Sequence, residues 1–143
     1  TNSGDKTLLS MSSGEIMYVH NYDERRAQDT SSYDSLGRFI VAKYVMGKVI
    51  VYARYCHNSD VDVHAGQVVA VGEALGEYGN TGYSFGDHVH VDFWISDADI
   101  VDAQLAGMTP CTMYVSPWPG SKQLRNIDAT KTLTDLGLDV KRG

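Results

Sequence analysis

A regular spacing of glycine and aliphatic residues restricts the fold of this chain more than any other feature. It runs Val63-x-x-Gly66-x-x-Val69-x-x-Gly72-x-x-Leu75-Gly76. A helix here would contain three glycines within eleven residues, and each would cost about 1 kcal/mol relative to alanine. We therefore expect short strands with a glycine at each bend, in a compact and tightly curved β-structure.

The segments before this stretch also favour strands. Alternating and β-branched residues predict strands at 8–11 and 16–20, joined by a tight turn at 12–15. They also predict a hairpin made by 38–45 and 49–55 around Gly47. Residues 57–60 are expected to leave the second hairpin strand as a polar loop. The polar segment 21–35 has no periodic apolar face and predicts a long surface loop.

The segments after the glycine stretch predict one more strand and a short helical tail. Residues 88–95 alternate as a strand, and Ser96 or Asp97 can cap a helix at 99–105. An irregular segment is expected at 110–120, where Pro117-Trp118-Pro119 would hold the tail against the body. A second short helix is expected at 128–136, stopped by Gly137. The fold class is thus mainly β, an antiparallel sheet with one or two short C-terminal helices.

Length and charge narrow the domain count and the classes of partner. The 143 residues predict one domain, with a core at about 8–95 and a C-terminal extension at 96–143. The net charge of −6 gives no basic footprint, so nucleic acid is not an expected partner. The sequence contains no run of about 18 apolar residues, so a membrane-spanning helix is not expected. The two cysteines, Cys56 and Cys111, can pair or stay free.

Two histidines follow a glycine-rich turn at 79–86. His88 and His90 are two residues apart on a predicted strand, so their side chains point to the same face. Two imidazoles on one rigid strand suit a metal or acid–base site, although strand histidines are often only structural. Asp92 alternates onto that face, where it would either orient an imidazole or solubilise the strand.

The order of these features resembles peptidase family M23, the lysostaphin and LytM type of zinc endopeptidase. The family pattern has Tyr-x-His, the glycine spacing described above, a Gly-Asn-Thr-Gly-x-Ser turn and His-x-His. It fits this chain from Tyr55 to Phe93, with a weaker match from Leu8 to Tyr55 and none after about Ile95. The resemblance implies a compact antiparallel sheet, small and barrel-like.

The resemblance also implies a site and a substrate. His90 would bind zinc, His57 and His88 would be catalytic, and the turn residues Asn80, Thr81, Gly82 and Tyr83 would line the substrate groove. A zinc-bound water of lowered pKa would attack peptide cross-links of bacterial peptidoglycan. The expected location is extracytoplasmic: secreted, in the cell envelope or in a phage virion.

One part of the family pattern is missing. Two further zinc ligands, from a His-x-x-x-Asp motif, should precede the first strands, and the alignment places them before Thr1. Thr1 with Asp5, or His20 with Asp23, are imperfect substitutes. We expect either that an N-terminal segment carrying the motif is missing from this chain, or that the chain is a degenerate, non-catalytic module for binding or assembly.

Cys56 is next to His57 in the sequence, and two interpretations of it stay open. It is either a thiol ligand or nucleophile, or a small buried residue. His64 lies in a turn and is expected to be exposed. A lipoyl- or biotinyl-type carrier is disfavoured, because the glycine-rich turns at 63–86 contain no lysine.

Overall fold

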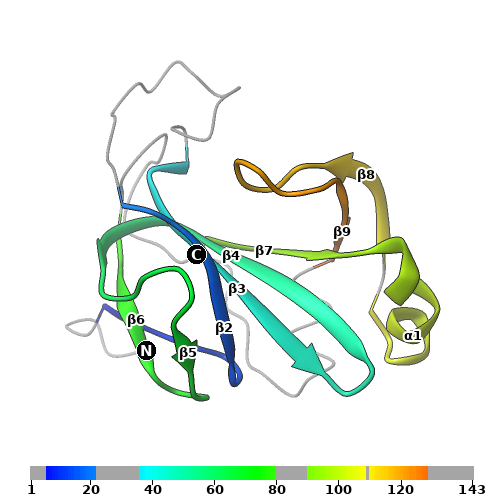
Figure 1. Cartoon of the computed structure of the whole chain (residues 1–143), viewed down its shortest axis with the longest axis horizontal. Helices are drawn as coiled ribbons and strands as arrows, with labels where there is room; N and C mark the ends of the chain where they lie inside the picture. Colours follow the sequence, from blue (N-terminus) through cyan, green and yellow to red (C-terminus); the bar gives the residue numbers. More distant parts are fainter. Residues whose placement is uncertain (1–5, 22–35, 80–89, 109, 129–143) are drawn as a thin grey trace.

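The computed structural model describes residues 6–21, 36–79, 90–108 and 110–128. Within them the chain is mainly β, with one helical segment between β7 and β8 (Figure 1). The elements are β1 (Thr7–Leu9), β2 (Gly14–His20), β3 (Arg38–Met46), β4 (Val49–Val61), β5 (Val68–Val69), β6 (Ala74–Tyr78), β7 (His90–Ile95), the 3-10 turn η2 (Asp97–Asp99), α1 (Ile100–Leu105), β8 (Pro110–Val115) and β9 (Leu124–Ile127).

The strands form one antiparallel sheet in the order β5-β2-β3-β4-β7-β9-β8. β6 pairs with β1 and with the second half of β4, so it lies off this path. The expected mainly β, antiparallel fold is confirmed, and the sheet is open rather than a closed barrel. β1 and β2 are neighbours in the sequence but do not pair, because β1 pairs with β6 instead.

The glycine stretch forms short strands separated by tight bends, as expected. Gly66 and Gly72 bend the chain with φ angles of 91° and 79°, which favour glycine. Gly76 lies within β6 at φ 153°, and a Cβ atom there would lie 2.2 Å from the carbonyl oxygen of Asp60. This glycine therefore allows β6 to lie directly against β4.

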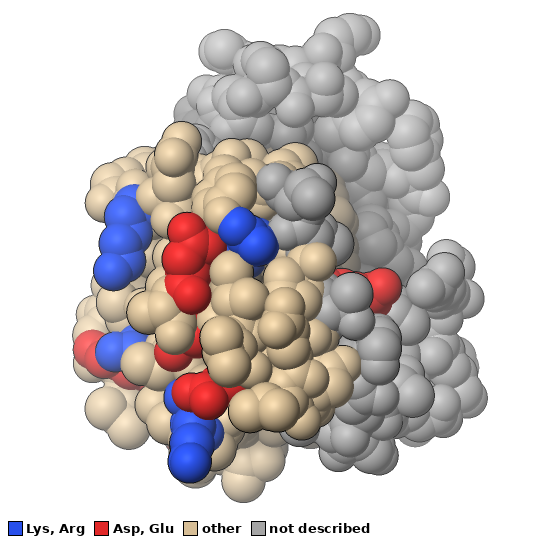
Figure 2. Space-filling view, turned by 90° about the vertical axis from the view of Figure 1, so that its right-hand side faces the viewer, with Lys and Arg blue, Asp and Glu red and all other residues tan. Residues whose placement is uncertain are grey.

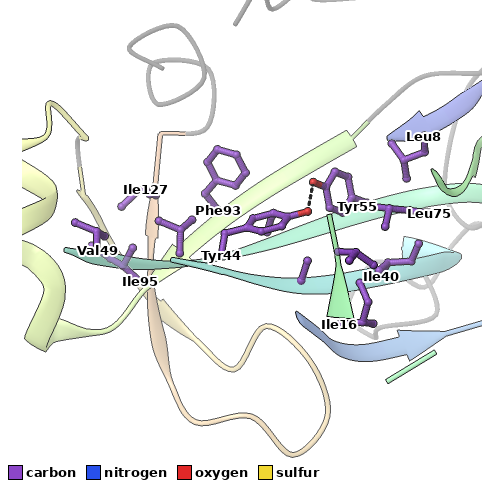
Figure 3. Close-up of a cluster of buried hydrophobic side chains, with 14 of the residues drawn as sticks. Leu8, Ile16, Ile40, Tyr44, Val49, Tyr55, Leu75, Phe93, Ile95 and Ile127 are labelled. Carbon is purple, nitrogen blue, oxygen red and sulfur yellow. Dashed lines mark hydrogen bonds between the residues drawn. The ribbon is translucent and has the colours of Figure 1, made fainter. Parts of the chain in front are cut away.

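A buried apolar cluster fills one side of the long hairpin formed by β3 and β4 (Figure 3). Inside it the hydroxyl of Tyr44 lies 2.8 Å from that of Tyr55 and 2.8 Å from the Oγ atom of Ser10. Burial raises the pKa of both phenols. Hydrogen bonds partly oppose this rise at Tyr44. Because Tyr55 points into this core, alternation places its neighbours Arg54 and Cys56 on the other face of β4.

Two expectations about the strands are wrong. Residues 57–60 belong to β4, which continues to Val61 because Asn58, Asp60 and Val61 pair with β6. The segment 110–120 is not all irregular, since β8 covers Pro110–Val115 and pairs with β9. β9 was not expected at all, and it extends the sheet beyond β7.

The first predicted helix is confirmed. It consists of η2 followed by α1. Ser96 occupies the N-cap position of η2 and Asp99 that of α1, and neither makes a side-chain capping hydrogen bond. Most of the predicted loop at 21–35 lies outside the described residues, and so does the predicted second helix apart from Asp128.

Charges of both signs are interspersed on the face shown in Figure 2, without a basic patch. No helix in the described ranges is long and apolar enough to cross a membrane.

Candidate functional site

An irregularity in β4 positions the first histidine of the site. β3 pairs Arg38 with Asn58 and Ile40 with Tyr55, so β4 has one more residue than β3 over this interval. His57 lies within this bulge and has a φ of 61°, the only positive φ of a non-glycine residue among those the structure describes. Regular alternation would give His57 the inward direction of Tyr55, and a bulge changes the direction of a side chain.

The second histidine comes from β7. His90 is the first residue of this strand and lies opposite Cys56 of β4. The ring centroids of His57 and His90 are 5.2 Å apart, with 55° between the ring planes. His57 is buried and the side chain of His90 is 36% exposed. The fold therefore brings together two predicted site residues that are far apart in the sequence.

Asp92 and Arg54 lie beside His90 on the same face. One oxygen of Asp92, Oδ2, is 3.2 Å from Nε2 of His90 and accepts a hydrogen bond from Nη2 of Arg54 at 2.9 Å. Burial alone would raise the pKa of Asp92, but the hydrogen bond and charge of His90, together with Arg54, lower it. The sequence left two roles open for Asp92, and the geometry supports the one that orients an imidazole.

Cys56 lies close to these groups, but its thiol is hard to deprotonate. Its Sγ, a nitrogen of His90 and an oxygen of Asp92 all lie within 4.8 Å of one another. Burial raises the pKa of the Cys56 thiol strongly, and the charge of Arg54 only partly opposes it. Cys56 is a free cysteine.

The described residues fit a zinc site only in part. Zinc binds deprotonated thiolate, neutral imidazole or carboxylate, with four ligands in a structural site and three plus water in a catalytic one. His90 offers a suitable imidazole, whereas burial raises the pKa of the Cys56 thiol and the carboxylate of Asp92 is already paired with Arg54. Within the described ranges, these groups do not complete a tetrahedral site.

Several predicted site residues lie outside the described residues. They are His88, Asn80, Thr81, Gly82, Tyr83, Thr1, Asp5 and Asp23. His20 is described: its ring stacks on Phe39 with centroids 5.1 Å apart, and its Nδ1 lies 3.1 Å from the carbonyl oxygen of Gly37. His64 is exposed, as expected.

No sequence motif pointed to Arg54. The signal that would have found it is the pairing of β4 with β7, which places Arg54 opposite Asp92.

The expectation that Trp118 holds the tail to the body is confirmed, because its ring lies 5.4 Å from that of Tyr52.

The family model described as Peptidase family M23 matches residues 2–102, well over half of the chain. No curated protein matches the chain at a significant level.

Solved structures of M23 proteins share the fold. The catalytic domain of the antimicrobial peptidase lysostaphin from Staphylococcus simulans is 24% identical, with a TM-score of 0.50 over 63% of this chain and 59% of that chain. A mutant catalytic domain of the prophage-encoded M23 protein EnpA from Enterococcus faecalis is 21% identical, with the same TM-score and coverage. The solution structure of lysostaphin is 21% identical, with a TM-score of 0.58 over 96% of this chain and 42% of that one. The chain thus spans less than two thirds of the length of each.

Proposed function

Because the chain belongs to peptidase family M23, we propose that it is a zinc-dependent endopeptidase that cleaves peptide cross-links of bacterial peptidoglycan. The observation that carries this proposal is the convergence of His57 and His90 on one face of the sheet. One of the two is held there by a left-handed residue in a bulge, and such backbone conformations cluster at functional sites.

Each proposed site residue has a distinct role. His90 provides one zinc ligand, and zinc, when bound, lowers the pKa of its water and polarises the peptide carbonyl. The imidazole of His57 lies next to His90, where it can accept a proton from a nucleophile or donate a hydrogen bond to the developing oxyanion. His88 shares these two roles with His57.

The substrate assignment uses the glycine-rich turn. Asn80, Thr81, Gly82 and Tyr83 would line a narrow groove that admits peptides with little side-chain bulk, such as those containing glycine or D-amino acids. Peptidoglycan cross-links have this character, and an extracytoplasmic location follows from such a substrate. The remaining zinc ligands would come from outside the described residues.

Zinc content and peptide release test this proposal together. The purified chain would be dialysed, analysed for zinc by elemental analysis and incubated with peptidoglycan while free amines are measured. We expect His90→Ala to lose both zinc and amine release. His57→Ala should keep zinc and lose about 100-fold or more in rate, as for removal of an acid–base group. His64→Ala, the same change at an exposed histidine, is the control and should match the parent chain.

The same experiment locates the remaining ligands. Stoichiometric zinc in the 143-residue chain would place all ligands within it, Asp5 or Asp23 being candidates. Zinc found only when gene-encoded residues preceding Thr1 are added would place the His-x-x-x-Asp ligands there. Absence of zinc from both forms would refute the proposal.

A second candidate function is a non-catalytic module that binds peptidoglycan or supports assembly in a cell envelope or phage particle. The observation that favours it is that the part of the chain the structure describes brings together one group of three possible metal ligands, Cys56, His90 and Asp92, without the His-x-x-x-Asp pair of the family pattern. This function predicts that the chain co-sediments with insoluble peptidoglycan in the presence of a chelator and releases no amines. Amine release that requires zinc would exclude it.

A further inference from the structure

Arg54 connects three parts of the molecule that are distant in the sequence. Its Nη2 donates to Asp92 of β7, and its Nη1 donates to the carbonyl oxygen of Pro117 in the C-terminal segment. The guanidinium carbon lies 5.3 Å from the ring centroid of Trp94. The side chain is only 12% exposed, so an arginine is largely removed from water beside the carboxylate that contacts His90.

We propose that Arg54 is a positioning residue that fixes the imidazole of His90 through Asp92 and ties the C-terminal segment 110–128 to the site. The shared atom is Oδ2 of Asp92, which contacts both Nη2 of Arg54 and Nε2 of His90. A carboxylate oxygen only accepts hydrogen bonds, so this contact selects the tautomer of His90 with the proton on Nε2. It leaves Nδ1 as the nitrogen with a lone pair and restricts rotation of a ring that is 36% exposed.

The C-terminal segment holds the other end of this connection. It lies beyond residues 2–102, the part matched by the family model. Trp118 packs against Tyr52, and the hydroxyl of Ser121 donates to the carbonyl oxygen of Trp118 at 2.6 Å, which closes the turn after Pro117. The carbonyl of Pro117 is therefore presented to Arg54 by a closed turn.

The two hydrogen bonds of Arg54 explain why an arginine is needed. Each terminal nitrogen of the planar guanidinium serves one acceptor, Asp92 on one side and Pro117 on the other. A lysine has a single nitrogen on a flexible stem and is not equivalent at a site with two fixed acceptors. We therefore expect Arg54→Lys to restore the contact with Asp92 only in part.

This inference rests on the proposed function only for its effect on cleavage, because the tautomer of His90 can be measured in the metal-free chain. Long-range proton–nitrogen NMR correlations at about pH 8, where an ordinary imidazole is neutral, report which nitrogen carries the proton. We expect the Nε2-protonated form to dominate in the parent chain. In Arg54→Met and Asp92→Ala the Nδ1-protonated form should increase, and Arg54→Lys should be intermediate.

Arg125→Met is the matched control. Arg125 also has an ion pair, 3.4 Å to Asp97, and a ring contact, 4.5 Å to Tyr114. Neither contact leads to His90, so the His90 spectrum should not change in this variant. If Arg54→Met does not fold, Trp118→Ala, which leaves the Arg54 side chain in place, provides the test of the link to the C-terminal segment.

A second readout is zinc affinity in competition with a chelator. Removing a group that orients a ligand lowers metal affinity by about 10- to 100-fold, and we expect this loss for Arg54→Met but not for Arg125→Met. An unchanged His90 spectrum in a folded Arg54→Met variant would overturn the inference. A spectrum that responds in a chain that never releases amines would sustain this inference while the proposed function fails.

Discussion

The backbone of His57 offers a direct test of how the site is built. Its φ of 61° lies in the left-handed region, where a Cβ atom collides with the following carbonyl oxygen. His57→Ala and His57→Gly both remove the imidazole and its contact with His90. The difference in the free energy of unfolding between these two variants therefore reports only on the backbone at this position.

The expected magnitude follows from two opposing effects. A Cβ atom in the left-handed region costs roughly 1–2 kcal/mol, which favours glycine. The greater freedom of glycine in the unfolded chain costs about 0.4–1 kcal/mol, which favours alanine. We therefore expect His57→Gly to be more stable than His57→Ala by about 0.5–1 kcal/mol.

Urea denaturation monitored by tryptophan fluorescence can measure this difference. Lys43 of β3 lies in a regular part of the same sheet, and its φ is not positive. At this control position we expect the opposite sign, with Lys43→Ala more stable than Lys43→Gly by roughly 0.5–1 kcal/mol. If His57→Ala proves the more stable variant of its pair, as at Lys43, the argument for a left-handed bulge is refuted.

Three other predictions concern groups around the core and the strand ends. Tyr44→Phe removes a buried hydroxyl that bonds Tyr55, and urea denaturation should show a loss of about 1–3 kcal/mol; a loss near zero would contradict this. The pKa of Asp62 is raised by its hydrogen bond with Asp60 and by nearby charges, so its folded-state stabilisation is present at low pH and lost as the pH rises. Asp62→Asn should therefore be more stable than the parent at pH 7 in thermal melts, and the gain should vanish below the ordinary pKa of 3.8. Burial raises the pKa of the Cys56 thiol, so mass spectrometry should find it unmodified by iodoacetamide in the native chain and modified in urea.

Local patterns predicted much of the fold, and long-range pairing accounts for most of the errors. The β3–β4 hairpin, the glycine bends and the first helix each depend on residues close in the sequence. Residues 57–60 look like a polar loop, but Asn58 is 1% exposed because it pairs with Tyr78 of β6. β9 escaped prediction for the same reason, since its partner β7 lies about thirty residues earlier in the chain.

In the candidate site, too, the features set by local pattern were predictable and those set by long-range pairing were not. The orientation of Asp92 toward His90 follows from strand alternation and was predictable, and the geometry agrees. Alternation gives His57 the inward direction of Tyr55, and nothing in the local sequence marks the extra residue that forms the bulge. Arg54 belongs to no motif and gains its role only from the register of β4 against β7.

The two described histidines are held by different means, and this bears on the choice between an enzyme and a scaffold. His57 is directed by its own backbone at a conformational cost of roughly 1–2 kcal/mol. His90 is oriented by a carboxylate that is itself fixed by a largely buried arginine. Both arrangements fix the imidazoles before any metal or substrate arrives, which is the property that acid–base catalysis requires. They are therefore the arrangements expected of the proposed endopeptidase.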